Sequence, residues 1–167
     1  INAATANATV LVAAGTYNED ITLKGGVNLQ GSGAAVTTIN GTGVASFAVQ
    51  ASSLSLPTFL DGFTIRASGG TGKGGLNING SSPFVLSHST VTGTGGTMYV
   101  AGVTVSNSSP KIDHSTITNN GGNPGAGLAV DNGSPTIVNS VISNNQHGIM
   151  GWTGGSPVII NSIIRNN

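Results

Sequence analysis

Short aliphatic blocks recur along this chain at nearly constant spacing, and stretches rich in Gly, Ser, Thr and Asn separate them. Within the blocks apolar residues alternate with polar ones, which is the period-two pattern of short, half-buried strands. Five blocks end at the same phase of the repeat, at Ile65, Val91, Ile117, Ile142 and Ile164. These ends lie 26, 26, 25 and 22 residues apart, so the pattern predicts a solenoid, a propeller or another array of stacked units.

One unit of the repeat, residues 102–120, predicts three short strands. The first strand is Val103 to Val105, in which the two valines point inward. Pro110 marks the start of the second strand, because proline within sheets is restricted to strand starts and edges. The second strand buries Ile112 and the third buries Ile117. The inward position of the second strand recurs as Leu60, Leu86, Ile112, Ile137 and Ile159.

Two kinds of turn position recur between these strands. The column formed by Gly62, His88, His114, Asn139 and Asn161 contains only residues that tolerate the left-handed backbone region, which predicts a tight turn of fixed conformation. From the third of these repeats onward the last strand ends in an Asn pair, and stacked amides can bond to the next rung. Three strands in each coil, pairing with their counterparts about 4.8 Å away, predict an all-β parallel β-helix of about six coils.

Composition supports a folded, turn-rich chain and excludes several classes of partner. Gly, Ser, Thr and Asn make up about half of the 167 residues, yet an aliphatic residue returns to the same phase five times, which disorder would not produce. Five basic and five acidic residues give zero net charge, so we expect no nucleic-acid partner. No apolar run approaches the roughly 18 residues of a membrane span, and the absence of cysteine excludes disulfides and thiolate metal sites.

The opening stretch, TVLVAAGTYNEDITLKGGVNLQGSGAAVTTING, resembles the start of right-handed parallel β-helix proteins of the pectin lyase-like superfamily. The resemblance lies in the Gly15-Thr16-Tyr17 turn, the acidic pair Glu19-Asp20 and the flanking strands, and the later repeats are similar to those of the same superfamily. It implies a right-handed, single-stranded β-helix. It also implies that residues 1–8 are the remnant of a capping helix and that Glu19 and Asp20 are structural.

We expect a single β-helix domain over residues 1–167. Residues 1–45 would hold the cap and first coils, and residues 46–167 the regular repeats of 22–27 residues. Nothing after Asn167 would cover Ile159, Ile164 and the open strand edges, and solenoids need polar caps to stay soluble. We therefore expect either that the chain is a segment of a longer protein, or that its end stacks on another copy.

Enzymes of the superfamily use clustered carboxylates, either as calcium ligands or as acid, base and nucleophile. The candidates here are Asp61 and Asp113, which share one column two coils apart with Ser87 between them. Their separation of about 9 to 10 Å is at the far edge of the range for inverting glycosidases. Because the connections are short and made of small residues, we predict that neither is catalytic and that no cofactor is needed. Calcium becomes a candidate cofactor if the enzyme alternative holds.

His88 and His114 would stack on adjacent coils with Asp113 beside them, which makes them candidate ligands for a transition metal. Because no further ligand can be named, we favour two histidines that fill a turn column. Trp152, Asp131 and Tyr99 are candidates for carbohydrate contact, since an exposed aromatic near an acid is a common sugar-binding arrangement. Thr90, Thr92, Thr116 and Thr118 resemble the arrays of ice-binding β-helices, but the pattern does not continue into the neighbouring coils.

We predict a non-catalytic, extracellular or cell-surface β-helix that serves as a structural or adhesive module and contacts polysaccharide or another protein along one face. The alternative is the N-terminal part of a polysaccharide lyase, hydrolase or esterase. An ice-binding β-helix is a more remote alternative.

Overall fold

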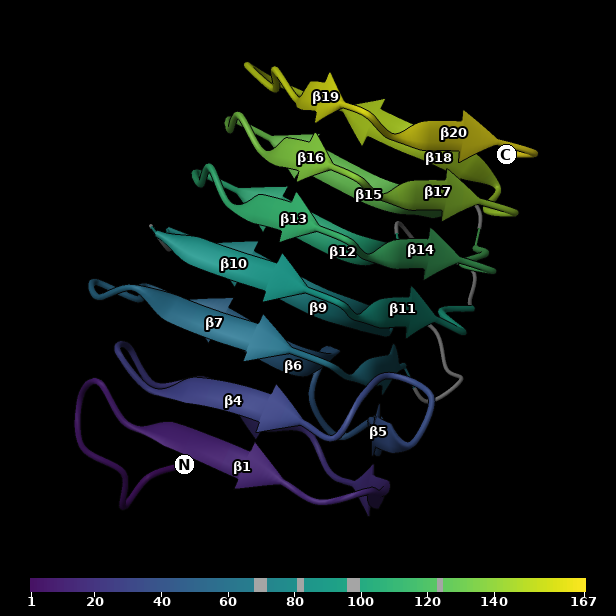
Figure 1. The fold of residues 1–167 in the computed structure, drawn as a ribbon. Helices are drawn as coiled ribbons and strands as arrows, with labels where there is room; N and C mark the ends of the chain where they lie inside the picture. Colours follow the sequence, from purple (N-terminus) through teal and green to yellow (C-terminus); the bar gives the residue numbers. More distant parts are fainter. Residues whose placement is uncertain (68–71, 81–82, 96–99, 123–124) are drawn as a thin grey trace.

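The computed structural model describes residues 1–67, 72–80, 83–95, 100–122 and 125–167. These residues form twenty strands and no helix, and the strands belong to three sheets in which all neighbours are parallel. Every third strand along the chain returns to the same sheet one coil further on, so that the coils stack from the N-terminus to the C-terminus (Figure 1). The predicted parallel β-helix is therefore confirmed.

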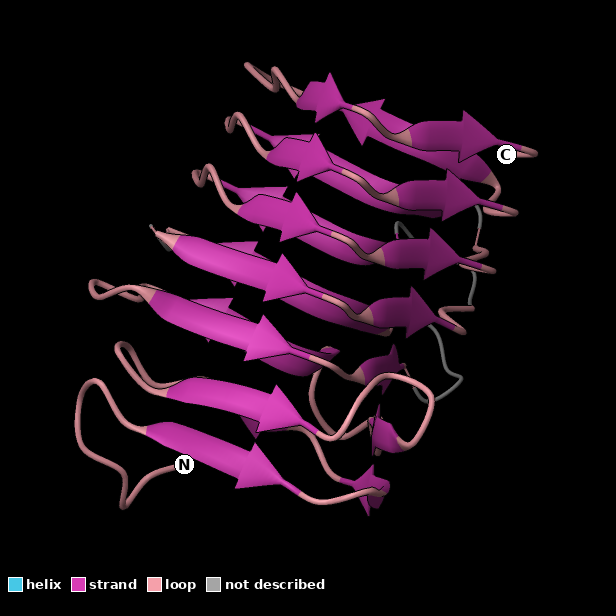
Figure 2. Ribbon diagram, in the orientation of Figure 1, coloured by secondary structure: helices cyan, strands magenta, loops and turns pink. Residues whose placement is uncertain are grey.

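Short strands and turns alternate around each coil (Figure 2). The first sheet contains β1 (Thr9–Val12), β4 (Asn28–Gly31), β7 (Thr58–Asp61), β10 (Phe84–Ser87), β13 (Lys111–Asp113), β16 (Thr136–Val138) and β19 (Val158–Ile160). The second sheet contains β2 (Gly15–Asn18), β5 (Thr37–Asn40), β8 (Thr64–Arg66), β11 (Thr90–Thr92), β14 (Thr116–Thr118), β17 (Val141–Ser143) and β20 (Ile163–Arg165). The third sheet contains β3 (Ile21–Thr22), β6 (Phe47–Ser52), β9 (Gly74–Asn79), β12 (Val100–Ser106), β15 (Gly125–Asp131) and β18 (His147–Gly151).

The core is built from inward columns of aliphatic side chains, as the period-two pattern predicted. Leu60, Leu86, Ile112 and Ile137 pair in register and are fully buried. Ile65, Val91, Ile117 and Ile142 do the same in the second sheet. In the last coil the corresponding Ile159 and Ile164 are 45% and 43% exposed. Stacking on both sides is thus what buries each aliphatic residue.

The predicted turn column is confirmed on every coil where it was expected. Gly62, His88, His114, Asn139 and Asn161 have φ angles of 76°, 43°, 44°, 50° and 45°. This left-handed conformation turns the chain between the first and second sheets. It also places the side chains of this column one above another on the outside of the molecule.

A buried serine follows this column on successive coils, at Ser89, Ser115 and Ser140. The Ser115 hydroxyl accepts a hydrogen bond from the Ser89 amide at 3.2 Å, and the Ser140 hydroxyl accepts one from the Ser115 amide at 3.1 Å. Each hydroxyl also donates to the carbonyl two residues before it in its own chain. The serines therefore satisfy backbone amides that the turn removes from the sheets.

Asparagine side chains form a second ladder inside the last three coils, as the paired asparagines predicted. The Asn120 amide group donates to Asn145 Oδ1 at 3.0 Å, and the Asn145 amide group donates to Asn167 Oδ1 at 2.9 Å. Glycine is required beside this ladder, because a Cβ on Gly127 would lie 2.6 Å from Asn145 Nδ2 and one on Gly102 would lie 2.5 Å from Asn120 Nδ2. The glycines that enter the third sheet thus make room for the amides.

Residues 1–8 form turns, where sequence reasoning expected the tail of a capping helix. The amides of Ala4 and Ala8 donate to the carbonyls of Ile1 and Thr5, and Asn7 has a φ of 67°, which is incompatible with a continuing helix. None of the described residues forms a helix that is long and apolar enough to cross a bilayer.

Asp20 is structural, as the family resemblance implied. Its carboxylate accepts hydrogen bonds from the amides of Thr42 and Ala45 and from the Thr42 hydroxyl. Partial burial acts to raise the pKa of Asp20, but the hydrogen bonds from Ala45 and Thr42 outweigh it and hold the pKa below its ordinary value. Asp20 thereby fixes the turn that follows β5.

Candidate functional site

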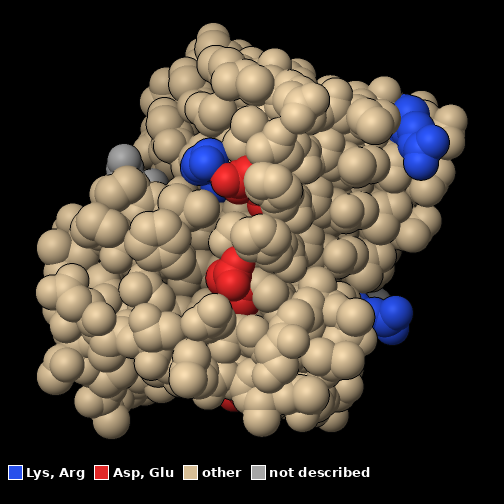
Figure 3. All heavy atoms as spheres, in the orientation of Figure 1, with Lys and Arg blue, Asp and Glu red and all other residues tan. Residues whose placement is uncertain are grey.

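The charged side chains on one face are few and form small isolated patches on an otherwise uncharged surface (Figure 3). Asp61 at the end of β7 pairs with Ser87 in β10, and Ser87 pairs with Asp113 in β13. The predicted column of two aspartates with a serine between them is therefore confirmed. His88 and His114 follow directly in the turn column.

These residues contact one another closely. The Ser87 hydroxyl donates to Asp61 Oδ1 at 2.7 Å, and His88 Nδ1 lies 2.8 Å from the same oxygen. One coil further on, His114 Nδ1 lies 2.7 Å from Asp113 Oδ1, and Lys111 Nζ lies 2.7 Å from Asp113 Oδ2. The two imidazole rings stack with centroids 5.2 Å apart and an interplanar angle of 19°. We refer to Asp61, Ser87, His88, Lys111, Asp113 and His114 as the carboxylate–imidazole cluster.

Electrostatics in this cluster favour the ionised form of Asp113. The hydrogen bond from Lys111, together with the contact to His114 and the charges of both partners, holds the pKa of Asp113 below its ordinary value despite some burial. A general acid in glycoside cleavage needs the opposite, a carboxyl whose pKa is raised. Asp113 is therefore suited to accept hydrogen bonds and bind cations.

The candidate metal ligands are only partly brought together. His88 and His114 lie side by side, and each has a carboxylate at its Nδ1 atom. Within the described ranges, however, no group of three or more His, Asp or Glu side chains is arranged to hold a metal ion. Any ion bound here would have to take its further ligands from water.

Two of the candidate carbohydrate contacts, Asp131 and Trp152, lie at the ends of strands of the third sheet. Asp131 ends β15, and its carboxylate accepts a 2.6 Å hydrogen bond from the Thr153 hydroxyl one coil further on. Trp152, next to Thr153, follows β18 and is 46% exposed. Tyr99, the third candidate, lies outside the described residues.

The threonines of the predicted ice-binding pattern stack on two adjacent coils, and the pattern does not continue into the coils on either side. Thr90 and Thr92 pair with Thr116 and Thr118 in register. On either side the pattern is interrupted, by Arg66 opposite Thr92 and by Val141 opposite Thr116. Pairs of threonine on one strand are thus limited to two coils, although the column of Thr90 continues through Thr64, Thr38 and Thr16.

A groove on the second sheet was missed by sequence reasoning. It has a volume of about 440 Å³ and is lined by Thr16, Ala34, Ala35, Thr38, Asn40, Thr64 and Arg66. The loop between β4 and β5 curls up beside the second sheet (Figure 1), and the Thr64 hydroxyl donates to the Ala34 carbonyl at 2.7 Å. The signal in the sequence was Gly33, whose φ of 119° allows the loop to fold back.

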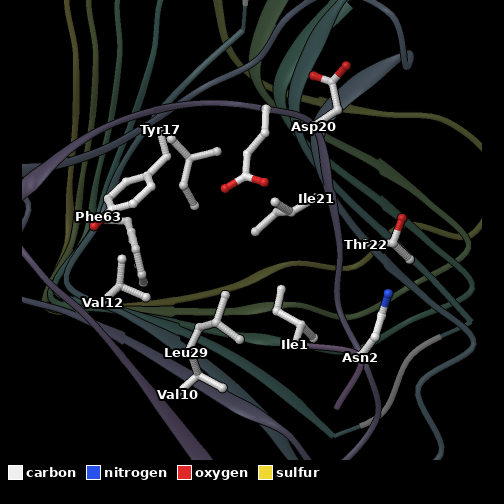
Figure 4. A pocket seen from close by; sticks show the side chains of 12 residues that line it. Ile1, Asn2, Val10, Val12, Tyr17, Asp20, Ile21, Thr22, Leu29 and Phe63 are labelled. Carbon is white, nitrogen blue, oxygen red and sulfur yellow. The ribbon is translucent and has the colours of Figure 1, made fainter. Parts of the chain in front are cut away.

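A second hollow of about 500 Å³ lies inside the first coil. Val10, Val12, Leu29 and Ile1 line it (Figure 4). These side chains belong to, or pack against, the hydrophobic core. We therefore interpret this hollow as the N-terminal end of the core.

Comparison with known proteins agrees with this geometry. Residues 16–167 match the family model described as "Right handed beta helix region". The chain belongs to the right-handed β-helix family, which confirms the predicted right-handed parallel β-helix. A comparison with curated proteins found no match.

The similar solved structures include several pectin methylesterases. The enzyme from Yersinia enterocolitica aligns with a TM-score of 0.52 and 16% identity over 94% of this chain and 61% of that one. The enzyme from carrot aligns with a TM-score of 0.49 and 12% identity over 98% and 76%. A pectin methylesterase in complex with hexasaccharide VII aligns with a TM-score of 0.47 and 14% identity over 90% and 74%. The chain thus spans about three fifths of the Yersinia enzyme, and the likeness shows a common fold.

Proposed function

We propose that this protein is a non-catalytic, extracellular or cell-surface β-helix that binds polysaccharide along one face. The observation that carries the proposal is the exposed Trp152 beside the hydrogen-bonded pair of Asp131 and Thr153. The stacked coils also provide an extended surface with few charged side chains. Such a surface suits an extended, uniform ligand better than a compact one.

The residues around Trp152 have the chemistry that sugars require. An indole offers a broad apolar face that can pack against the C–H groups of a pyranose ring. The Asp131 carboxylate retains acceptor capacity beyond the bond from Thr153, and sugar hydroxyls can donate to it. An aromatic platform and a polar group on adjacent coils therefore support recognition of one or two sugar units, with further units lying along the stack.

Trp152 is the only tryptophan of the chain, so its fluorescence reports directly on this site. We would titrate the protein with a panel of neutral and acidic polysaccharides, with and without calcium, and follow the emission. We expect one class of polysaccharide to shift the emission and to bind at least tenfold more weakly to Trp152→Ala, as measured by calorimetry. Asp131→Asn should weaken binding less, because the amide keeps one acceptor.

The matched control is Phe59→Ala, which removes another exposed aromatic, on the first sheet. It should leave polysaccharide binding unchanged. Equal losses in Trp152→Ala and Phe59→Ala, or binding that ignores both, would contradict the assignment of the face.

A second candidate function is cleavage or de-esterification of polysaccharide, and the column of Asp61, Ser87 and Asp113 is the feature that favours it. Its two carboxylates are separated by two rungs, about 10 Å. The same panel should be assayed for reducing ends, unsaturated products and released methanol. Turnover that Asp113→Asn abolishes while binding persists would replace the non-catalytic proposal with this one.

A further inference from the structure

We infer that His88 and His114 form a surface site for a divalent transition-metal ion, with Cu²⁺ bound more tightly than Zn²⁺. The site lies on the outside of the turn between the first and second sheets. It is separate from the proposed carbohydrate contact at Trp152, and its occupation does not depend on that function.

The neighbouring carboxylates determine which nitrogen of each ring carries the hydrogen. His88 Nδ1 lies 2.8 Å from Asp61 Oδ1, and His114 Nδ1 lies 2.7 Å from Asp113 Oδ1. An ionised carboxylate can only accept hydrogen bonds, so each Nδ1 atom must carry the hydrogen. In a neutral ring the lone pair is then on Nε2, which is the atom free to bind a metal.

Each ring has the carboxylate partner that is typical of a metal-binding histidine. Histidines that bind metals usually donate their other ring N–H to a carboxylate, which orients the ring and increases its basicity. Here both rings have such a partner, supplied by the preceding coil for His88 and by the same coil for His114. Two rings oriented in this way on adjacent coils are more than is needed to fill a turn, since asparagine fills the same column at Asn139 and Asn161.

The two rings lie close together and are exposed. Their centroids are 5.2 Å apart and their side chains are 66% and 53% exposed. One ion about 2.0 to 2.1 Å from each Nε2 atom, with the two nitrogens in adjacent coordination positions, requires these atoms to lie about 3 to 3.4 Å apart. Because the rings are nearly parallel, their outer edges must tilt toward each other until the Nε2 lone pairs converge on one point. The broad terminal torsion of histidine allows this movement. Water can supply the remaining ligands.

Charge and donor type determine the preferred ion. Asp61 and Asp113 contribute two negative charges, and Lys111 neutralises one of them, so the surroundings of the rings favour a cation. Imidazole nitrogen suits Cu²⁺, Ni²⁺ and Zn²⁺, and among these the intrinsic order of affinity places Cu²⁺ first. Mg²⁺ and Ca²⁺ prefer oxygen ligands and should not compete.

The experiment is a titration of untagged protein with CuCl₂ and with ZnCl₂ in a non-coordinating buffer. We expect one Cu²⁺ per chain by calorimetry, with two nitrogen ligands resolved by electron paramagnetic resonance. His88→Asn and His114→Asn should each weaken Cu²⁺ binding at least tenfold and leave one nitrogen ligand. Asparagine keeps the left-handed turn, as it does at Asn139 and Asn161. Circular dichroism should confirm an unchanged fold.

Two further variants make the result decisive. His147→Gln removes an exposed histidine of the third sheet and should leave Cu²⁺ binding unchanged. Asp61→Asn removes the carboxylate that orients His88 and should weaken binding about tenfold while retaining two nitrogen ligands. The inference is overturned if the wild type binds no Cu²⁺, if its spectrum shows a single nitrogen, or if the double variant His88→Asn/His114→Asn binds as tightly as the wild type.

Discussion

Asn145 provides the sharpest test of what holds adjacent coils together. Its side chain is buried and makes four hydrogen bonds across three coils. Oδ1 accepts from the Asn120 amide nitrogen and from Asn120 Nδ2, both at 3.0 Å. Nδ2 donates to the Ile117 carbonyl at 3.1 Å and to Asn167 Oδ1 at 2.9 Å. Asn145→Leu keeps the number and branching of the side-chain heavy atoms but removes all four bonds.

The expected loss follows from the groups left without partners. Two donors of Asn120 and the Ile117 carbonyl lie in the buried part of the ladder, and an unsatisfied buried group costs about 1 to 3 kcal/mol. Relaxation and the added apolar area of leucine reduce the sum, so we expect a loss of about 3 to 5 kcal/mol in the free energy of unfolding. Urea denaturation followed by circular dichroism measures this value.

Hydrogen exchange locates the effect, because the Asn120 amide should lose much of its protection. The matched control is Asn144→Gly, which changes the neighbouring, exposed asparagine. Asn144 has a φ of 55°, which glycine adopts freely, so this change should lower the free energy of unfolding by less than about 1 kcal/mol. If Asn145→Leu also costs less than about 1 kcal/mol, the amide ladder does not stabilise the stack and the reasoning fails.

Three other predictions follow from single contacts. Gly127→Ala places a Cβ 2.6 Å from Asn145 Nδ2, so it should lower the free energy of unfolding by about 1 to 3 kcal/mol in the same urea assay. Folding lowers the pKa values of Asp20 and Asp113, so the stability that these carboxylates contribute is present above about pH 4 and is lost as the pH falls through their pKa values in the folded protein. The free energy of unfolding should therefore decline below about pH 4. The decline should be less steep in Asp20→Asn. Arg66 lines the groove on the second sheet, away from Trp152, so Arg66→Ala should leave polysaccharide binding, measured by calorimetry, unchanged. A loss as large as that of Trp152→Ala would contradict the assignment of the binding face.

The repeating parts of the fold could be predicted from sequence because their cause is local. The inward columns that contain Leu60 and Ile65 follow from period two. The left-handed turns at His88 and Asn139 follow from a column restricted to Gly, His and Asn. The ladder beyond Asn119 follows from pairs of asparagine at the same phase.

The features that sequence reasoning missed depend on contacts between coils. The buried serines could not be distinguished from the many exposed ones until the turn placed Ser89 and Ser115 inside. The Arg66 groove depends on a loop 30 residues earlier in the chain folding beside it. The partner of His88 is likewise Asp61, from the preceding coil. Residues 1–8 were mistaken for helix because their alanines favour helix while Asn7 is held in a left-handed turn.

Because successive coils pair in register, a whole coil can be removed or added without changing the kind of contact that its neighbours make. Thr92 occupies the same position as Thr118 one rung later, so deleting residues 93–118 would join Thr92 to Asn119. It would bring Ser89 against Ser140 in place of Ser115. Every bond of the serine ladder would then be re-formed by an equivalent neighbour. Insertion of a duplicated coil would likewise preserve the contacts between neighbouring coils. The length of the β-helix can therefore change in steps of one rung, about 4.8 Å.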